Sequence, residues 1–368
     1  MKILLAVLLI YFLIYFIYIL FLFVFFERLK PYISNPPLSD KPLVSVLVAA
    51  RNEEDNIGEC LKALASMDYP EDKFEVLIGN DRSEDNTRSI ILEFIKTHKK
   101  FKLLDITENV GQAKGKANVL AQLARKANGE YLFITDADIS IPENWVKEML
   151  GNYKKSSGTV SGVTMIKGET LFAKLQSMEW MHAFGMVKAV SDQNIPVSAV
   201  GNNMMIPRRV YEETGGYENI PFSVTEDFEL FKATLDLGYD YQQLMGPGVL
   251  AFSKPLDSLK RLLNQRRRWM HGAVKIPVVL STLLLLQSLF FPVILVTMFI
   301  VPNFATLVWS GKLLLQYSFI NRVYKKLDYK FPLWKYIVIY EFYTGFVSLL
   351  TLLYYLKPGK IEWKGRRF

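Results

Sequence analysis

Two aspartates separated by one residue follow a short apolar run near the middle of the sequence. Asp136 and Asp138 come directly after Tyr131–Thr135, a run that predicts a buried strand. In an extended segment residues i and i+2 point the same way, so the two carboxylates converge. Paired carboxylate oxygens suit Mg²⁺ or Mn²⁺, and such an ion would bridge the phosphates of a nucleoside diphosphate. We therefore predict a metal site at Asp136 and Asp138.

A second pair of acids, Glu226 and Asp227, follows Thr225 at the start of a predicted helix over Thr225–Leu237. One interpretation is that both carboxylates stabilise the N-terminus of this helix. The other is catalytic. Transfer of a sugar with inversion needs a carboxylate that accepts the proton of the attacking hydroxyl. These two interpretations predict different consequences for mutation.

Three consecutive arginines and a tryptophan lie in Gln265–Trp269, just before a long apolar segment. This composition is typical of a positively charged membrane interface with an aromatic anchor. In the alternative, Arg268 binds a diphosphate through its bidentate guanidinium, and Trp269 forms a platform for an acceptor.

Other common chemistries are excluded. The segment Gly111–Ala117 resembles a phosphate-binding loop, but its spacing is one residue short and Ala117 stands where Ser or Thr must hold Mg²⁺. Cys60 is the single cysteine, so no intrachain disulfide can form. The formal net charge of +8 comes from basic clusters beside apolar stretches. This arrangement favours an anionic membrane surface over nucleic acid.

Short apolar runs alternate with helical patterns between residues 43 and 135. This rhythm predicts a mostly parallel sheet with helices on both faces, which binds ligands at the carboxyl ends of its strands. The expected strands are Leu43–Ala49, Phe74–Gly79, Phe101–Ile106 and Tyr131–Thr135, and the expected helices are Glu53–Met67, Glu84–Thr97 and Gln112–Ala127. Further along, we expect helices over Leu171–Val190 and Leu256–His271 and short strands over Asn203–Pro207 and Tyr239–Met245.

The N-terminal run Ile3–Phe26 contains no charged residue and is long enough to cross a bilayer core of about 30 Å. A signal peptide would have a shorter apolar region followed by a small-residue cleavage site. Here Glu27–Lys30 follows, so we expect an uncleaved anchor. Arg28, Lys30 and Lys41 favour a cytoplasmic location for the segment that comes next.

Three more apolar stretches lie near 274–301, 303–320 and 333–356. The basic loop 321–330 and the basic tail both favour the cytoplasmic side, and one crossing at 333–356 cannot satisfy both. Either that segment is re-entrant or the tail departs from the positive-inside tendency. The expected division of the chain is an anchor (1–28), a proline-rich linker (29–42), a catalytic domain (43–255), an interfacial helix (256–272), a membrane region (273–356) and a basic tail (357–368).

In register over 43–272, these motifs resemble the inverting family 2 glycosyltransferases with a GT-A fold. The matching segments are Val44–Glu53, Asn80–Thr87, Lys114–Asn118, Asp136–Asp138, Gly201–Asn203, Gly215–Tyr217, Glu226–Asp227 and Gln265–Trp269. With its flanking membrane segments, the chain is similar to ceramide and hopanoid glycosyltransferases and to cellulose and poly-N-acetylglucosamine synthases. The family pattern has aspartate where Asn80 stands, which leaves the choice of nucleotide open.

The resemblance implies an α/β chain with a GT-A, Rossmann-like nucleotide-sugar-binding domain and assigns roles to its residues. The catalytic base is Asp227, beside Glu226, and the metal ligands are Asp138 and Asp136. The implied donor-binding residues are Ala50, Asn52, Glu53, Asp81, Lys114, Lys116, Asp136, Gln265, Arg268 and Trp269. The implied acceptor-binding residues are Gly201, Asn202, Asn203 and Trp269.

The expected function is therefore transfer of a sugar, with inversion, from a nucleotide sugar that we expect to be a UDP-sugar. A Mg²⁺ or Mn²⁺ cofactor, an inner-membrane location and a cytoplasmic catalytic domain complete the expectation. The membrane region is small, which favours a lipid acceptor over a growing polysaccharide. A processive synthase and a catalytically inactive scaffold stay open as alternatives.

Overall fold

The computed structural model describes residues 2–38, 40–273, 278–356, 362–363 and 366–367. Its central sheet has seven strands in the order β3-β2-β1-β4-β8-β6-β9. The strands β1 to β4 run parallel to one another, and β8 pairs antiparallel with β4. Their bounds are β1 Val44–Ala50, β2 Phe74–Asn80, β3 Phe101–Asp105, β4 Tyr131–Asp136, β6 Ser157–Ser161, β8 Asn203–Pro207 and β9 Asp240–Gln243. The expected mostly parallel α/β sheet is confirmed.

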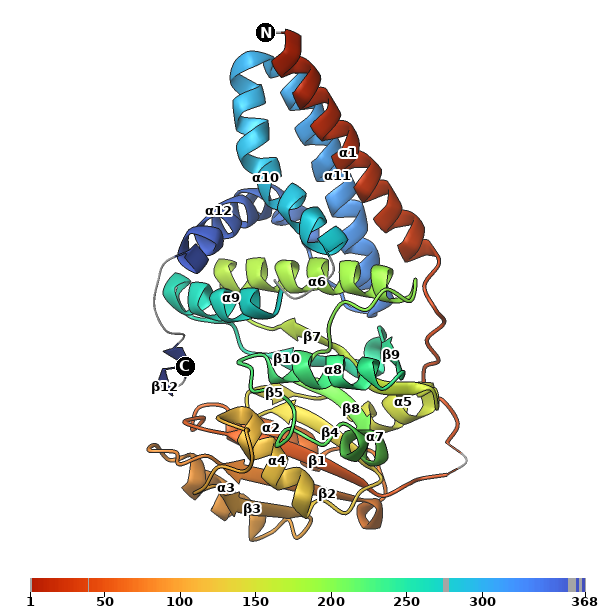
Figure 1. The fold of residues 1–368 in the computed structure, drawn as a ribbon, viewed down its shortest axis with the longest axis vertical. Coiled ribbons are helices and arrows are strands. Elements are labelled where there is room, and N and C mark those ends of the chain that lie inside the picture. Colours follow the sequence, from red (N-terminus) through yellow and green to blue (C-terminus); the bar gives the residue numbers. More distant parts are fainter. Residues whose placement is uncertain (1, 39, 274–277, 357–361, 364–365, 368) are drawn as a thin grey trace.

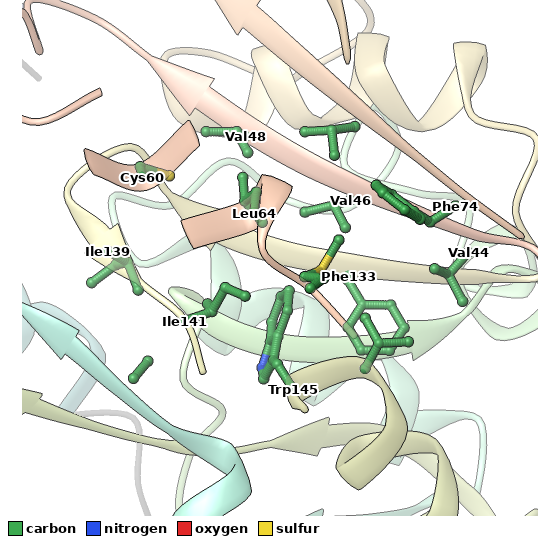
Figure 2. Close-up of a cluster of buried hydrophobic side chains, with 14 of the residues drawn as sticks. Val44, Val46, Val48, Cys60, Leu64, Phe74, Phe133, Ile139, Ile141 and Trp145 are labelled. Atoms are coloured by element: carbon green, nitrogen blue, oxygen red, sulfur yellow. The ribbon is translucent and has the colours of Figure 1, made fainter. Parts of the chain in front are cut away.

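Helices cover both faces of this sheet because successive strand residues point to opposite sides. Val46, Val48 and Phe133 pack under α2 (Ile57–Ala65), α3 (Thr87–Ile95) and α5 (Trp145–Asn152), around the fully buried Trp145 (Figure 2). Leu47 and Leu132 point the other way and pack against the remaining helices of the domain. Those helices are α4 (Lys116–Lys126), α7 (Arg208–Glu213) and α8 (Glu226–Asp236).

A second, three-stranded sheet has the order β5-β10-β7, with bounds β5 Ile139–Ser140, β10 Leu250–Ser253 and β7 Val163–Ile166. Above it lie α6 (Leu171–Ser191) and α9 (Leu259–Ala273), between the sheets and the remaining helices (Figure 1). The sequence predicts α6 and α9 but not these three strands, which have at most four residues each.

The other helices lie on the far side of α6 and α9 (Figure 1). They are α1 (Lys2–Glu27), α10 (Val278–Ile300), α11 (Pro302–Lys326) and α12 (Ile337–Leu356). The first three form a bundle with a shared apolar core that includes Phe12, Phe290 and Val308. Among the described residues, α1 and α12 are long and apolar enough to cross a membrane, and Leu284–Ile300 is a shorter apolar helix. The predicted loop 321–330 is wrong in part, because α11 continues to Lys326.

The proline-rich segment after α1 packs along α5. The hydroxyl of Tyr32 donates a hydrogen bond to Glu148 at 2.8 Å, and the backbone N–H of Asn35 donates to the other oxygen of the same carboxylate at 2.8 Å. The backbone N–H of Ile33 donates to Asn152 at 2.9 Å. These bonds fix the path from α1 to the catalytic domain. A short hairpin, β11 (Glu362–Trp363) with β12 (Arg366–Arg367), lies near the C-terminus.

Candidate active site

The carboxyl ends of β1, β2 and β4 lie at one edge of the sheet. Ala50 pairs with Asn80 in the β1–β2 register, and Ala49 pairs with Asp136 in the β1–β4 register. The three polar segments that the sequence places after these strands therefore start side by side. Such an edge is where open α/β sheets bind ligands.

Hydrogen bonds join the segment after β1 to the segment after β2. The guanidinium of Arg51 donates to the carbonyl oxygens of Asp81 at 2.6 Å and Arg82 at 3.0 Å. The backbone N–H of Asn52 donates to the hydroxyl of Ser83 at 3.1 Å, and Asn52 and Arg82 have φ values of 51° and 54°. Few non-glycine residues adopt this conformation. The two segments therefore form one rigid rim around the buried side chain of Asp81.

Asn80 has a clear structural role. Its side-chain N–H donates to Asp105 at 2.8 Å, and its amide oxygen accepts a hydrogen bond from the backbone N–H of Ser83 at 3.2 Å. The Arg88 guanidinium and the Asn80 amide lower the pKa of Asp105. An aspartate at position 80 would face the Asp105 carboxylate. The asparagine that stands in place of the family's aspartate therefore avoids repulsion with the Asp105 carboxylate.

Nearby, the carboxylate of buried Glu53 accepts a hydrogen bond from Asn56 at 2.8 Å.

Lys116 joins the two acidic motifs. Its Nζ lies 2.5 Å from Asp136 Oδ1 and 2.8 Å from Glu226 Oε1. Burial alone would lower the pKa of Lys116, but the charges of Asp136, Glu226 and Asp227 hold that pKa well above its usual range. A buried ammonium therefore holds the end of β4 against the start of α8.

Glu226 and Asp227 are neighbours whose pKa values are shifted in opposite directions. Burial opposes ionisation of Glu226, but the charges of Lys116 and Arg268 hold the pKa of Glu226 below its usual value. For Asp227, burial and the adjacent charge of Glu226 raise the pKa. Oδ2 of Asp227 accepts a hydrogen bond from the backbone N–H of Gly201 at 2.9 Å, and Oδ1 accepts one from that of Phe228 at 2.9 Å. Thr225 precedes α8, but its side chain makes no capping bond.

Gly201, Asn202 and Asn203 differ in what they can offer to a ligand. A methyl group at position 201 would come within 2.6 Å of the Cβ of Asp227, so Gly201 allows that carboxylate to pack against the backbone. The amide oxygen of Asn202 accepts a hydrogen bond from Thr164 at 2.9 Å. Asn203 is fully buried, and its amide bonds to Trp145 and to two backbone carbonyls. The amide of Asn203, which the resemblance assigns to acceptor binding, is therefore engaged in the core instead.

The helix α9 brings Arg268 to a pocket between the loop before α4 and the loop before α8. Lys114, Lys116, Phe222, Glu226 and Arg268 line this pocket together with Gly115, Ala117, Ser223 and Val224. Nζ of Lys114 lies 5.7 Å from the centre of the Phe222 ring. The sequence gives no signal for Phe222, because a lone aromatic residue in a loop has no characteristic spacing.

Trp269 and Gln265 lie half-buried on the same helix. The indole of Trp269 packs edge-on against Trp180 of α6, with ring centres 5.5 Å apart, and the Arg266 guanidinium lies 4.3 Å from the Trp269 ring. The structure thus places Trp269 at the junction of α9 and α6.

The residues at the end of β4 fit a divalent cation only if a ligand completes its coordination. Asp138 lies in the turn that follows Asp136 rather than in an extended strand. Burial raises the pKa of the Cys60 thiol, and the charges of Asp138 and Asp136 add to the effect, so both carboxylates lie near Cys60. No group of three or more His, Cys, Asp or Glu side chains in the described part of the chain could hold a metal ion. Phosphate and water oxygens would supply the other ligands, as Mg²⁺ prefers.

This arrangement defines a class of protein. A parallel sheet edge, two acidic motifs held by one lysine, and an arginine-lined pocket above them are features of a GT-A nucleotide-sugar-binding domain. The mannosyltransferase PcManGT from Pyrobaculum calidifontis, in complex with GDP-Man and Mn²⁺, has a similar fold. The TM-score is 0.63 at 20% identity, over 96% of this chain and 98% of that one.

The chain belongs to glycosyl transferase family 21, whose sequence profile matches residues 6–368. It is 30% identical over 245 residues to the probable glycosyltransferase YdaM of Bacillus subtilis, which covers 64% of this chain and 56% of YdaM. It is 27% identical over 321 residues to a poly-β-1,6-N-acetyl-D-glucosamine synthase of Staphylococcus epidermidis, which covers 84% of this chain and 71% of the synthase.

A third relative is the β-monoglucosyldiacylglycerol synthase of a Nostoc species, 27% identical over 241 residues, with 63% of this chain and 49% of that protein covered. The chain therefore matches about half of YdaM and of the Nostoc protein, and more of the staphylococcal synthase.

Proposed function

We propose that this protein transfers a sugar from a nucleotide-diphosphate sugar to a hydroxyl of a membrane lipid, with inversion at the anomeric carbon. The observation that carries the proposal is the pair of carboxylates at the start of α8. Glu226 is held ionised by Lys116, and Asp227 has a raised pKa beside it. Two carboxylates with diverging pKa values are the arrangement that acid–base chemistry requires.

In the proposed reaction the acceptor hydroxyl gives its proton to Asp227. Its oxygen forms a bond to the anomeric carbon, and the bond from that carbon to the diphosphate oxygen breaks on the opposite face. The nucleoside diphosphate leaves with the electron pair. Arg268 and Lys114 line the pocket where the diphosphate would lie, and a guanidinium binds phosphate through two parallel hydrogen bonds. The rim formed by Arg51, Asn52 and Asp81 would hold the nucleobase of the donor, which we propose is uracil.

Asp136 and Asp138 would hold the divalent cation. When bound, the ion would neutralise charge on the leaving diphosphate. We expect Asp138→Asn to weaken donor binding and remove most of the activity, because it removes an anionic metal ligand. Titration of the apoprotein with Mn²⁺, followed by its paramagnetic signal, measures ion binding without turnover. Unchanged Mn²⁺ affinity in Asp138→Asn, or full turnover in a chelator, would contradict this assignment.

The packing of the bundle supports a lipid acceptor. Within the described helices α1, α10 and α11, the side chains of Phe12, Tyr15 and Phe290 are almost fully buried and pack together in one apolar cluster. A growing glycan would need a polar path through such a bundle. The similarity to a polysaccharide synthase over most of this chain is the observation that favours the second candidate, a processive enzyme.

The deciding experiment incubates the purified full chain with a panel of radiolabelled nucleotide sugars, Mg²⁺ or Mn²⁺, and a membrane lipid extract. We expect label to enter a product that organic solvent extracts and that carries one or a few sugars. Label in a long, ethanol-insoluble polymer would show instead that the enzyme is a processive polysaccharide synthase. No transfer from any donor, with Asp227→Asn as the blank, would refute the proposed function.

A further inference from the structure

The helix α12 has the length and composition of a membrane span, but it lies across the foot of the bundle (Figure 1). The bundle core formed by α1, α10 and α11 contains no α12 residue among its described members. It lies between the bundle helices α10 and α11 on one side and α9 and α6, the helices that cover the catalytic domain, on the other. Length and composition cannot distinguish a helix that crosses a bilayer from one that lies on it.

Polar contacts join α12 to α6, α9 and α11. The hydroxyl of Tyr343 donates to Glu179 of α6 at 2.9 Å, and the hydroxyl of Tyr354 donates to Asn264 of α9 at 3.0 Å. Glu341 pairs with Lys312 of α11 and is 2% exposed. These contacts are spread over almost four turns of α12, so the helix is held along its length and not at one end.

The opposite side of α12 is an uncovered apolar stripe. Ile339, Phe346 and Leu353 are 45%, 54% and 57% exposed and lie seven residues apart, so they share one helix face. Phe342, Leu349 and Leu356 extend the stripe and are also exposed. An apolar surface of this length in water is unfavourable. The occupant that fits it is the acyl-chain layer of a bilayer.

The stripe is continuous with the bundle. The ring of Phe342 lies 5.9 Å from that of Phe291 in α10 and 5.5 Å from that of Trp309 in α11, centre to centre. Lipid around the bundle would therefore also reach α12. Trp334, which is 68% exposed, precedes the helix and is the residue type that anchors at membrane interfaces.

We infer that α12 lies in the membrane–water interface on the catalytic-domain side, with its apolar stripe among the acyl chains of that leaflet, and does not cross the bilayer. This position reconciles the two basic segments that flank the helix. Both the segment before α12 and the tail after it then lie on one side, as the positive-inside tendency requires. The inference depends on insertion of the bundle in a membrane and is independent of the sugar-transfer reaction.

The test measures depth along the helix. In a Cys60→Ser background, single cysteines replace Ile339, Phe346 and Leu353, and each carries a nitroxide in the full chain reconstituted in phosphatidylcholine–phosphatidylglycerol vesicles. Relative accessibility to oxygen and to a water-soluble nickel chelate reports depth. Leu307, which is 71% exposed and lies beyond Trp309 toward the end of α11 that is farthest from the catalytic domain, provides the deep control.

We expect the three α12 labels to have the same depth and the Leu307 label to be deeper. If α12 crosses the bilayer, the two outer labels differ in depth by about 21 Å, because they are fourteen residues apart at 1.5 Å each. A Phe346 label as deep as the Leu307 label would overturn the inference. So would three labels that the nickel chelate reaches freely, since α12 would then not contact lipid.

A second measurement needs no substitution in α12. In sealed vesicles, a membrane-impermeant maleimide probes a cysteine in place of Lys330, and an antibody probes an epitope added after Phe368. We expect both to be accessible from the same side, the side on which the catalytic domain is digested by protease. Accessibility from opposite sides would establish a crossing by α12 and contradict the inference.

Discussion

At the level of single residues, the site depends on how Lys116 distributes charge between two carboxylates. It neutralises Glu226 and Asp136 directly, at 2.8 Å and 2.5 Å. Asp227 makes no ion pair at such a distance among the described contacts, and its oxygens accept backbone hydrogen bonds from Gly201 and Phe228. The structure therefore separates a carboxylate that is paired with Lys116 from a carboxylate that is bonded to backbone N–H groups, and we propose that the second accepts the proton.

Asp227→Asn tests this separation. The change is nearly isosteric and removes the proton acceptor, so turnover should fall by roughly 10²- to 10⁴-fold. Donor affinity, measured by calorimetry, should change little. If Asp227 only stabilised the N-terminus of α8, the same change would cost about 1 kcal/mol of stability and leave the chemistry intact. A larger loss of turnover at saturating donor in Glu226→Gln would show that the base is the other carboxylate.

The dependence of activity on pH gives a second test at this scale. The charge of Glu226 contributes to the raised pKa of Asp227. Glu226→Gln removes that charge, so the pKa of Asp227 should fall. A base must be deprotonated to act, so the acidic limb of the kcat profile should move to lower pH. Glu143→Gln, at an exposed position away from the site, serves as the control. An acidic limb that stays in place or moves upward would contradict the assignment.

At the level of elements, α9 uses three consecutive arginines in three different directions. Arg266 pairs with Glu179 of α6 at 2.9 Å, Arg267 lies 5.8 Å from the ring of Tyr354 in α12, and Arg268 lines the pocket. Successive helical residues point about 100° apart, so one short segment can contact α6, α12 and the pocket.

Substitution of each arginine by alanine should separate these roles. Arg268→Ala should weaken donor binding about 10- to 100-fold, because a hydrogen bond to a charged group contributes about 1.5–3 kcal/mol. Arg267→Ala, the matched control, should leave donor affinity nearly unchanged. Arg266→Ala should lower the thermal midpoint, because it leaves Glu179 without its cation. Equal losses of donor affinity in Arg267→Ala and Arg268→Ala would indicate general electrostatic attraction instead.

The sequence predicts the elements that long periodic patterns define and misses those that tertiary contacts define. The strands β1 to β4 and β8 and the helices α6 and α8 lie within a few residues of their predicted bounds. The strands β5, β7 and β10 are too short for a pattern, because their pairing comes from segments far apart in the chain. The extension of α11 to Lys326 was missed because its last turns are polar, where hydropathy gives no signal.

The candidate site shows the same limit. The motifs indicate which acids gather at the sheet edge, but they cannot show how each side chain is used. Gly201 and Asn203 belong to one motif. Yet Gly201 contacts Asp227, whereas Asn203 supports Trp145 in the core. Only the packing of β8 between β4 and β6 determines which side chain of such a motif faces the site.

At the level of the whole molecule, α1 and α11 both end beside the catalytic domain (Figure 1). Glu27 at the end of α1 pairs with Arg322 near the end of α11 at 2.8 Å. Arg28, Lys30, Lys325 and Lys326 lie at this end as well. Basic residues next to apolar helices favour the cytoplasmic face, where anionic lipids are also abundant. The nucleotide sugars that the proposed reaction needs would then reach the site directly.

Protease treatment of sealed vesicles tests this orientation. In inside-out vesicles the catalytic domain should be digested, because its exposed lysines and arginines face the added trypsin. In right-side-out vesicles the same domain should survive until detergent opens the membrane, since trypsin cannot cross a bilayer. A resident cytoplasmic protein trapped in the vesicles controls for leakage. Protection of the catalytic domain in inside-out vesicles would place it on the other side of the membrane, away from a cytoplasmic donor pool, and the proposed reaction would then need a donor delivered across the bilayer.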